Sequence, residues 1–421
     1  MKRRLIKKFN NSGKLFVYTL LGATVVAGGL FSIGYFPASF SSLTKYDIES
    51  SAENISEIAP EVPKVIHLKT PEPLKAIYMT QCVVGTKDFR QKLVDLIGRT
   101  ELNAIVIDIK DYSGTLSFKP KSQIFLPAWN ASKCGATDMK EFLEYLHKEG
   151  IYTIGRVTVF QDPYMTKTRP DLAVKKKSDG TIWKDYKGLS FVDVGAREHW
   201  DYTVLLAKES YEIGFDEINF DYVRFPSDGD MKDIDFALSR GKSKAEALRE
   251  FFEYLQQQLK ETGVKTSVDL FGMTTTNTDD LNIGQVLENA LPYFDYVSPM
   301  VYPSHYPPNF NGWKNPNLYP GEVVAYSMGK AVERAISTTT TINLFNSTPI
   351  ASTTPQLFTK PVWNKLKLRP WLQDFKYGGT YGPVEVKAQI QATYDVGLTS
   401  WMLWSPSNKY TESVLEAEIK N

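Results

Sequence analysis

The sequence predicts an α/β fold, a (β/α)8 barrel of the TIM type preceded by an N-terminal transmembrane helix and a flexible linker. After Pro73, short apolar runs typical of strands alternate eight times with longer helical patterns, as repeated βα units of a parallel sheet do. Several helical patterns stop at a glycine, namely Gly150, Gly214, Gly263 and Gly397. Eight such units over about 350 residues describe a barrel with insertions. An open doubly wound sheet is the main alternative, but no GxGxxG or GxxxxGK(S/T) motif follows a strand, and we expect no nucleotide cofactor.

The N-terminal 36 residues have the pattern of a membrane anchor. Residues 1–14 carry six Lys or Arg side chains and no acid, and Leu15–Phe36 is an uncharged, mostly apolar stretch of 22 residues. A helix of about 20 residues crosses the hydrocarbon core, and the basic flank places the N-terminus in the cytoplasm. We therefore expect a transmembrane signal anchor over 15–36 and an extracytoplasmic remainder. A cleaved signal peptide is the alternative, because Pro37-Ala38-Ser39 would permit cleavage.

Residues 37–73 predict an extracytoplasmic linker. The segment is polar, contains five prolines and has an acidic, Ser-rich middle, so it cannot build a core. One folded domain is then expected over residues 74–421.

The barrel elements follow in chain order. The predicted strands are Lys75–Met79, Ala104–Asp108, Tyr152–Val159, Glu217–Asp221, Ser267–Gly272, Tyr296–Tyr302, Pro370–Phe375 and Trp401–Ser405. The predicted helices are Lys87–Gly98, Asp138–Lys148, Arg197–Gly214, Lys244–Thr262, Leu281–Leu291, Gly321–Ser337, Val384–Val396 and Glu412–Ile419.

The connections predict where a site would lie, because barrel sites form on the loops that follow the strands. Three of these loops are long, 112–137, 161–195 and the aromatic 303–320, and we expect them to wall a cleft. The Thr-, Ser- and Pro-rich insert 338–359 instead joins a helix to the next strand. It belongs to the opposite face, and we assign it no catalytic role.

Composition excludes some functions. With 49 basic and 48 acidic side chains, the net charge is +1, so the chain has no overall positive potential that would attract nucleic acid. The four histidines are scattered and no zinc-type spacing exists, so no metal is expected. Cys82 and Cys134 could form one bridge in an oxidising compartment, although a sequence does not give pairing. Aromatic residues make up 13% of the chain, which fits a large aromatic core or exposed rings that stack on sugars.

Two aspartates carry the predicted chemistry. Period-two alternation turns Asn219 and Asp221 of the fourth strand, and Asp269 of the fifth, into the barrel. A single buried Asp would more often be structural, but two at the rims of adjacent strands favour catalysis. Paired carboxylates are what glycosidic bond cleavage requires. We expect Asp221 to be the nucleophile or charge stabiliser and Asp269 to be the general acid. Arg224, which follows Asp221 closely, is expected to keep that carboxylate ionised or to bind a substrate hydroxyl.

The other inward positions fit a sugar site. They are Tyr78, Asp108, Lys110, Arg156, Tyr302 and Trp404. Asp374 and Gln373 stay ambiguous, because a one-residue register decides which of them points inward, and Asp374 would replace Asp269 as the acid if it did. His305 is either a sugar ligand or a loop residue.

These motifs resemble a known family. The stretches GRVTVFQDP (155–163), GFDEINFDYVRFP (214–226) and DLFG (269–272) are similar to a bacterial family of domains of unknown function described as glycoside hydrolases. The later pieces SPMVYPSHY (298–306), RPWLQDF (369–375) and WSP (404–406) resemble the same family, and the similarity runs from about residue 74 to the C-terminus.

The resemblance implies a TIM barrel related to the α-amylase and α-galactosidase group, with the nucleophile at the end of the fourth strand, which is Asp221 here. The sequence departs from the family at 191–194, where Phe-Val-Asp-Val replaces a Trp-x-x-Pro element. The expected function is glycosidase activity on a cell-surface or environmental polysaccharide. A barrel that binds carbohydrate without cleaving it is the alternative.

Overall fold

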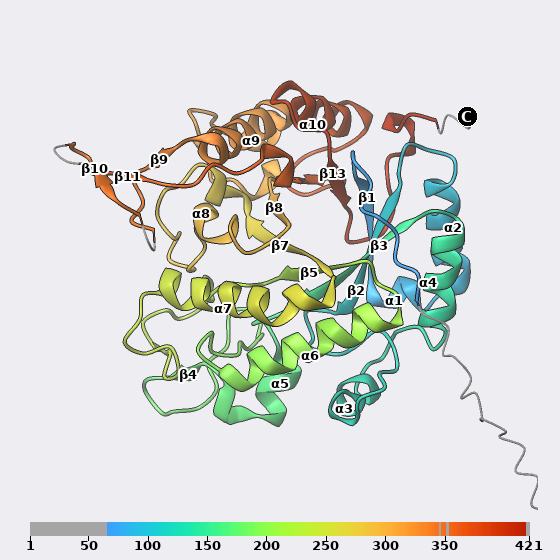
Figure 1. Cartoon of the computed structure of the whole chain (residues 1–421), viewed down its shortest axis with the longest axis horizontal. Coiled ribbons are helices and arrows are strands. Elements are labelled where there is room, and N and C mark those ends of the chain that lie inside the picture. The colour runs from blue at the N-terminus through green and yellow to red at the C-terminus, as the bar shows by residue number, and fades with distance from the viewer. Residues whose placement is uncertain (1–64, 345–346, 351–352, 418–421) are drawn as a thin grey trace, which may run out of the picture. The chain divides into compact units, whose positions relative to one another are not determined.

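The computed structural model describes residues 65–344, 347–350 and 353–417 (Figure 1). The basic segment 1–14, the anchor predicted over 15–36 and the linker up to residue 64 lie outside these residues. Within the described ranges, no helix is both long and apolar enough to cross a membrane. The last part of the predicted linker is described and contacts the barrel. The Leu68 N–H donates to Asp216 Oδ1 at 2.8 Å, and Thr70 Oγ1 lies 3.0 Å from Tyr152 Oη.

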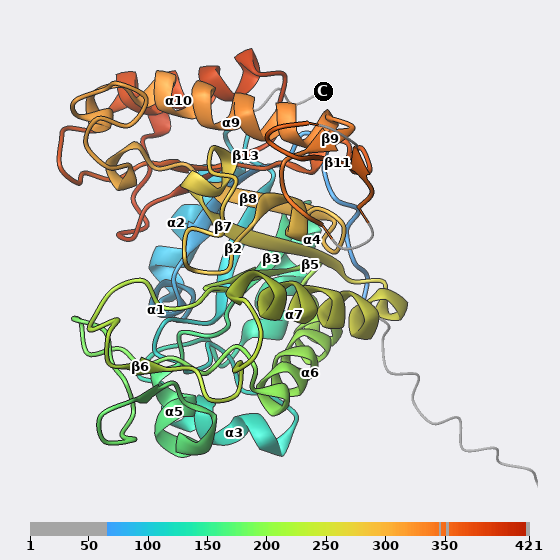
Figure 2. The ribbon, with the colours of Figure 1, turned by 90° about the vertical axis from the view of Figure 1, so that its left-hand side faces the viewer.

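Eight parallel strands close into one barrel, as predicted (Figures 1 and 2). The strands are β1 (Lys75–Met79), β2 (Ala104–Lys110), β3 (Tyr152–Thr158), β5 (Glu217–Asp221), β7 (Lys265–Phe271), β8 (Tyr296–Met300), β12 (Trp371–Gln373) and β13 (Trp401–Trp404). They follow one another around the barrel in chain order, and β13 pairs with β1 to close it. Each predicted strand exists, and its ends differ from the prediction by at most a few residues.

Helices surround these strands (Figure 2). They are α1 (Gln81–Val84), α2 (Lys87–Ile97), α3 (Leu126–Asn130), α4 (Met139–Lys148), α5 (Pro163–Thr168), α6 (Arg197–Ile213), α7 (Lys244–Leu259), α8 (Leu287–Ala290), α9 (Pro320–Ile336) and α10 (Pro383–Asp395). All four predicted glycine stops have positive φ, from 72° at Gly150 to 128° at Gly214. Glycine adopts such a backbone conformation with little strain.

Two helix predictions are wrong. The helix predicted over 281–291 is reduced to the four residues of α8, because Leu281 and Asn282 adopt positive φ. Asp279 and Asp280 accept the N–H groups of these two residues, and such side-chain bonds compete with a helix. The helix predicted over 412–419 is only a 3-10 turn, Glu412–Val414, in its described part.

The barrel has an outer and an inner apolar layer. Ile105 and Ile107 of β2 belong to the outer layer under the helices, whereas Ala104 and Val106 belong to the interior cluster. Asp108 is the next residue after Ala104 and Val106 in this alternation, so its side chain also points into the barrel. The predicted alternation therefore places polar side chains inside the barrel at the C-terminal ends of the strands.

The insertions contain small sheets that the sequence pattern does not predict. Residues 338–359 include β9 (Thr339–Thr340), β10 (Pro349–Ile350) and β11 (Leu357–Thr359), which pair in an antiparallel sheet. The loops after β3 and β5 pair through β4 (Lys175–Lys176) and β6 (Ile234–Asp235).

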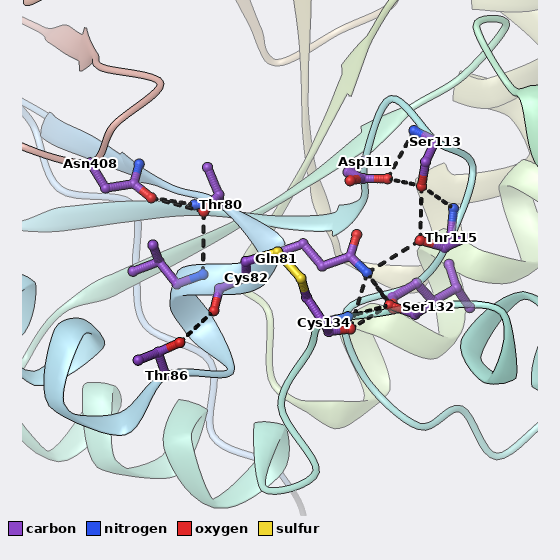
Figure 3. The surroundings of a disulfide bond; sticks show 12 residues. Thr80, Gln81, Cys82, Thr86, Asp111, Ser113, Thr115, Ser132, Cys134 and Asn408 are labelled. Carbon is purple, nitrogen blue, oxygen red and sulfur yellow. Dashed lines mark hydrogen bonds between the residues drawn. A yellow bond between two sulfur atoms is a disulfide. The ribbon is translucent and has the colours of Figure 1, made fainter.

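A disulfide joins Cys82 of α1 to Cys134 in the long loop after β2, 52 residues further along (Figure 3). Beside it, the buried amide of Gln81 donates to the backbone carbonyl of Leu116 at 2.9 Å. The Thr80 N–H donates to Asn408 Oδ1 at 3.1 Å. The loops that follow β1, β2 and β13 are therefore held together at the C-terminal end of the barrel.

Candidate active site

Arg156 of β3 is the centre of a buried polar cluster inside the barrel. Its Nη1 donates to Asp108 Oδ1 of β2 at 2.6 Å, and its Nε donates to Asp221 Oδ2 of β5 at 3.0 Å. The same Nε lies 4.0 Å from Asp269 Oδ2 of β7. Arg156 is 4% exposed, and each of the three aspartates is 3% exposed or less. Four residues that the sequence predicted to share an inward phase are thus in one cluster.

The cluster has more negative than positive groups. One guanidinium faces three carboxyl groups, and a buried carboxylate without a partner is unfavourable. Burial, together with the charge of Asp221, raises the pKa of Asp269 well above its ordinary value. Burial raises the pKa of Asp108 to about 6, against the lowering effect of Arg156. The cluster therefore retains protons at a pH where exposed aspartates are ionised.

Asp269 is oriented by two donors on one oxygen. Asn219 Nδ2 donates to Asp269 Oδ1 at 2.9 Å, and Trp371 Nε1 donates to the same oxygen at 2.8 Å. Oδ2 is left facing Arg156. Trp371 was not among the predicted site residues, although it shares its strand face with Gln373. Period-two alternation would have identified Trp371 only if the register of the seventh strand, which decides between Gln373 and Asp374, had been known.

Asp221 ends β5 at a strained turn. Tyr222 has φ of 52°, which is rare for a residue with a side chain, and its N–H donates to Asp221 Oδ1. The Asp221 side chain is 5% exposed, compared with 1% for Asp269. Asp221 is therefore the more accessible of the two carboxyl groups.

The prediction that Arg224 pairs with Asp221 is wrong. The turn at Tyr222 directs Arg224 away, so that Nη1 donates to the Phe225 carbonyl at 3.1 Å and the guanidinium lies 5.3 Å from the Tyr222 ring centroid. Arg156 provides the cation instead.

Aromatic side chains enclose the cluster. Tyr78 Oη donates to Asp108 Oδ2, and the Tyr78 ring stacks on Trp404 with centroids 3.9 Å apart. The Arg156 guanidinium lies 5.1 Å from the Trp404 ring centroid. Burial and the charges of Asp269 and Asp221 raise the pKa of Tyr302 well above its ordinary value. Tyr78, Tyr302 and Trp404 thus lie where the inward phase predicted.

Residues 76–410 match the model of a family described as a "putative glycosyl hydrolase domain". The chain belongs to this family. That membership confirms the resemblance found in the motifs, and this part of the chain is called the glycosyl hydrolase domain below. No sequence among curated proteins matches the chain.

Two solved structures of low sequence identity share the fold, and a third structure is similar over about half of the chain. The PgaB (BpsB) glycoside hydrolase domain from Bordetella bronchiseptica is 10% identical with a TM-score of 0.54, over 82% of this chain and 99% of that one. Alpha-L-fucosidase isoenzyme 2 from Paenibacillus thiaminolyticus is 11% identical with a TM-score of 0.52, over 81% of this chain and 47% of that one. A hypothetical protein from Ruminiclostridium thermocellum ATCC 27405 is 35% identical with a TM-score of 0.42, over 49% of this chain and 98% of that one.

Three predicted residues of the glycosyl hydrolase domain lie apart from the carboxyl cluster. Both carboxyl oxygens of Asp374 accept hydrogen bonds from Thr411, at 2.7 Å each, because the strand register turns Trp371 rather than Asp374 inward. Lys110 forms a separate buried ion pair with Asp162 at 2.6 Å. His305 is an exposed loop residue that contacts the ring of Tyr302 at a centroid distance of 5.4 Å.

Within the described residues, no group of three or more His, Cys, Asp or Glu side chains is placed to hold a metal ion. The space among the three aspartates is occupied by the guanidinium of Arg156.

Proposed function

We propose that this protein is a membrane-anchored glycoside hydrolase that cleaves a cell-surface or environmental polysaccharide with Asp221 and Asp269. One observation carries the proposal. Two aspartates at the C-terminal ends of adjacent barrel strands face the same arginine, in a domain of the glycosyl hydrolase family. Barrel active sites lie at this end of the strands, and glycosidic bond cleavage uses such a pair.

The environments of the two carboxyl groups differ in the way that acid and nucleophile require. Asp221 is the more accessible and is paired with Arg156, which suits a carboxylate that attacks the anomeric carbon. The pKa of Asp269 is raised by burial and by the charge of Asp221, which suits a group that carries a proton near neutral pH. A carboxyl group whose pKa is raised by its environment commonly acts as the general acid beside an accessible carboxylate.

The spacing allows retention of anomeric configuration and excludes only the more widely spaced inverting pairs. Asp221 Oδ2 and Asp269 Oδ2 lie 3.0 and 4.0 Å from the same Arg156 Nε, so their separation cannot exceed the sum of these distances. Retaining pairs are about 5–5.5 Å apart, and inverting pairs are about 6.5–9.5 Å apart.

The retaining reaction has two steps. In the first, Asp221 forms a bond to the anomeric carbon while the glycosidic bond breaks and the leaving oxygen takes the Asp269 proton. In the second, water attacks the same carbon, returns its proton to Asp269 and releases Asp221. Proton NMR of the first product identifies its anomer.

We place the barrel outside the cytoplasm. The support is the uncharged stretch 15–36 behind its basic flank, and the Cys82–Cys134 disulfide, since such bonds persist in oxidising compartments. Cell fractionation tests this proposal, and the protein should remain with the membranes. Soluble protein that begins near Ser39 would indicate a cleaved signal peptide in place of the anchor, with the barrel still outside the cytoplasm.

A carbohydrate-binding barrel without activity is the second candidate. It is favoured by the enclosure of Asp269, whose side chain is 1% exposed and whose Oδ1 already accepts two hydrogen bonds. A screen of the purified full-length protein and Asp221→Asn against labelled oligosaccharides and bacterial wall polysaccharides separates the two. Cleavage by the wild type alone supports the glycosidase. Equal binding by both without cleavage supports the binding function.

A further inference from the structure

Exposed tyrosines gather at one end of the barrel. In the described part of the chain there are four, Tyr112 after β2, Tyr186 after β3, Tyr319 after β8 and Tyr377 after β12, and they are 39–78% exposed. Each lies in a loop that follows a barrel strand, at the end where barrel sites form. Tyrosine is usually partly buried, so this distribution marks the C-terminal face as a binding surface.

One of the four is joined to the carboxyl cluster by a run of rings. Tyr302 is 6% exposed and its ring centroid lies 5.4 Å from that of His305 and 5.6 Å from that of Phe375. His305 in turn lies 5.9 Å from Tyr377, which is 63% exposed. The loops after β8 and β12 supply these rings, and the two strands are neighbours in the barrel.

The run leads outward from the carboxyl groups to solvent. Its buried end is placed beside the aspartates because Tyr302 follows β8, which pairs with the Asp269 strand β7. At its outer end, the Tyr377 ring is exposed rather than packed in the core. An exposed aromatic ring offers an apolar face and, in tyrosine, a polar edge. A pyranose ring presents the complement, an apolar C–H face with hydroxyl groups at its edge.

We propose that the run Tyr302–His305–Phe375–Tyr377, called the aromatic run below, holds sugar units of an extended glycan outside the carboxyl pair. The inference rests on the proposed function and narrows its substrate class to a polysaccharide or long oligosaccharide bound across the β8 and β12 loops.

The test compares two variants of Tyr377 in the full-length protein. Tyr377→Ala removes the ring, and Tyr377→Phe retains it. Val362→Ala is the control, because Val362 is 55% exposed and lies in the connection that precedes β12, away from the aromatic run. The probes are labelled α-1,4-linked glucose and β-1,4-linked N-acetylglucosamine oligosaccharides, from disaccharide to octasaccharide, and bacterial wall polysaccharide.

Tyr377→Ala should raise KM for the longest cleaved probe by about three- to tenfold, the equivalent of one aromatic stacking contact. The KM for the shortest cleaved probe and the kcat for all probes should stay near wild type. Tyr377→Phe and Val362→Ala should both behave like wild type. If KM of Tyr377→Ala is unchanged, or rises equally for probes of all lengths, the proposed role of the aromatic run is wrong. The glycosidase proposal is not affected by that result.

Binding distinguishes the two proposals if no probe is cleaved. Fluorescence anisotropy then measures the affinity of the same probes for the wild type and for Tyr377→Ala. A length-dependent loss of affinity in Tyr377→Ala supports the aromatic run, and only the glycosidase proposal fails. Failure of every probe to bind overturns the aromatic run as well.

Discussion

Replacing Asp108 by asparagine should flatten the dependence of folding stability on pH. Asp108 is 2% exposed, and its carboxylate accepts hydrogen bonds from Tyr78 and Arg156. Asparagine has nearly the same shape and can still accept from Arg156. The substitution therefore removes the titration while leaving the packing of the barrel interior in place.

The size of the effect follows from the pKa of Asp108, which burial raises from 3.8 to about 6. Each pKa unit corresponds to about 1.4 kcal/mol. Protonation of Asp108 therefore stabilises the folded chain by up to about 3 kcal/mol relative to the unfolded chain. The folded protein binds this proton more tightly than the unfolded chain. The stabilising contribution is therefore fully present below pH 3.8 and is lost as the pH rises through about 6. The asparagine side chain of the variant has no such proton to lose.

Urea unfolding at a series of pH values measures the effect, with the free energy of unfolding obtained by linear extrapolation. The stability of Asp108→Asn relative to wild type should rise by about 2.4 kcal/mol between pH 4 and pH 7, since part of the effect is already lost at pH 4. Asp138→Asn is the control, because the hydrogen bond from Arg90 lowers the pKa of Asp138 to about 2, below this range. The relative stability of the control should change by only about 0.3 kcal/mol across this range, because its unfolded pKa of 3.8 lies just below pH 4. If the Asp108→Asn difference is equally flat, the charge imbalance inferred for the cluster is wrong.

Three further predictions concern catalysis and the disulfide. Asp221→Asn should lower kcat on any cleaved glycan roughly 10⁴–10⁶-fold at an unchanged melting temperature, and wild-type turnover would refute its role. Trp371→Phe removes an N–H donor that lowers the pKa of Asp269, so this pKa should rise. The basic limb of the pH dependence of kcat should then move to higher pH. A shift to lower pH would contradict the role of Asp269 as the acid. The double variant Cys82→Ser, Cys134→Ser should lose about 4 kcal/mol of stability for a 52-residue loop. Thiol reductant should destabilise the wild type in urea but not this variant, and equal effects on both would refute the contribution of the bond.

The barrel was predictable because its signals are local. Each strand has its own apolar run, and each of the four glycine stops adopts the positive φ that its position requires. The helix over 281–291 failed because Asp279 and Asp280 accept backbone N–H groups, a competition that apolar spacing does not reveal. The small sheet in 338–359 also escaped prediction, since its strands are two or three residues long.

The membership of the polar cluster was predictable, but its pairing was not. Period-two alternation placed Asp108, Asp221 and Asp269 inside the barrel, and the structure brings them together. The cation was misassigned because Arg224 is the sequence neighbour of Asp221. Arg156 is 65 residues away in the chain, yet it lies on the adjacent strand. Which side chains meet across strands depends on register, and a single sequence specifies register only weakly.

The arginine at position 156 also contributes to the raised pKa of Asp269, because its donors are shared unequally among the three aspartates. A guanidinium presents donors in a rigid fork, so one group can bond Asp108 through Nη1 and Asp221 through Nε and Nη2. Once these donors are engaged, Asp269 is left with an Nε contact of 4.0 Å and two neutral donors, Asn219 and Trp371. Its negative charge is the least compensated of the three, so it is the carboxyl group that most favours a proton. The asymmetry of a single fork thus adds to the burial and the charge of Asp221 that raise the pKa of Asp269, and distinguishes the proposed acid.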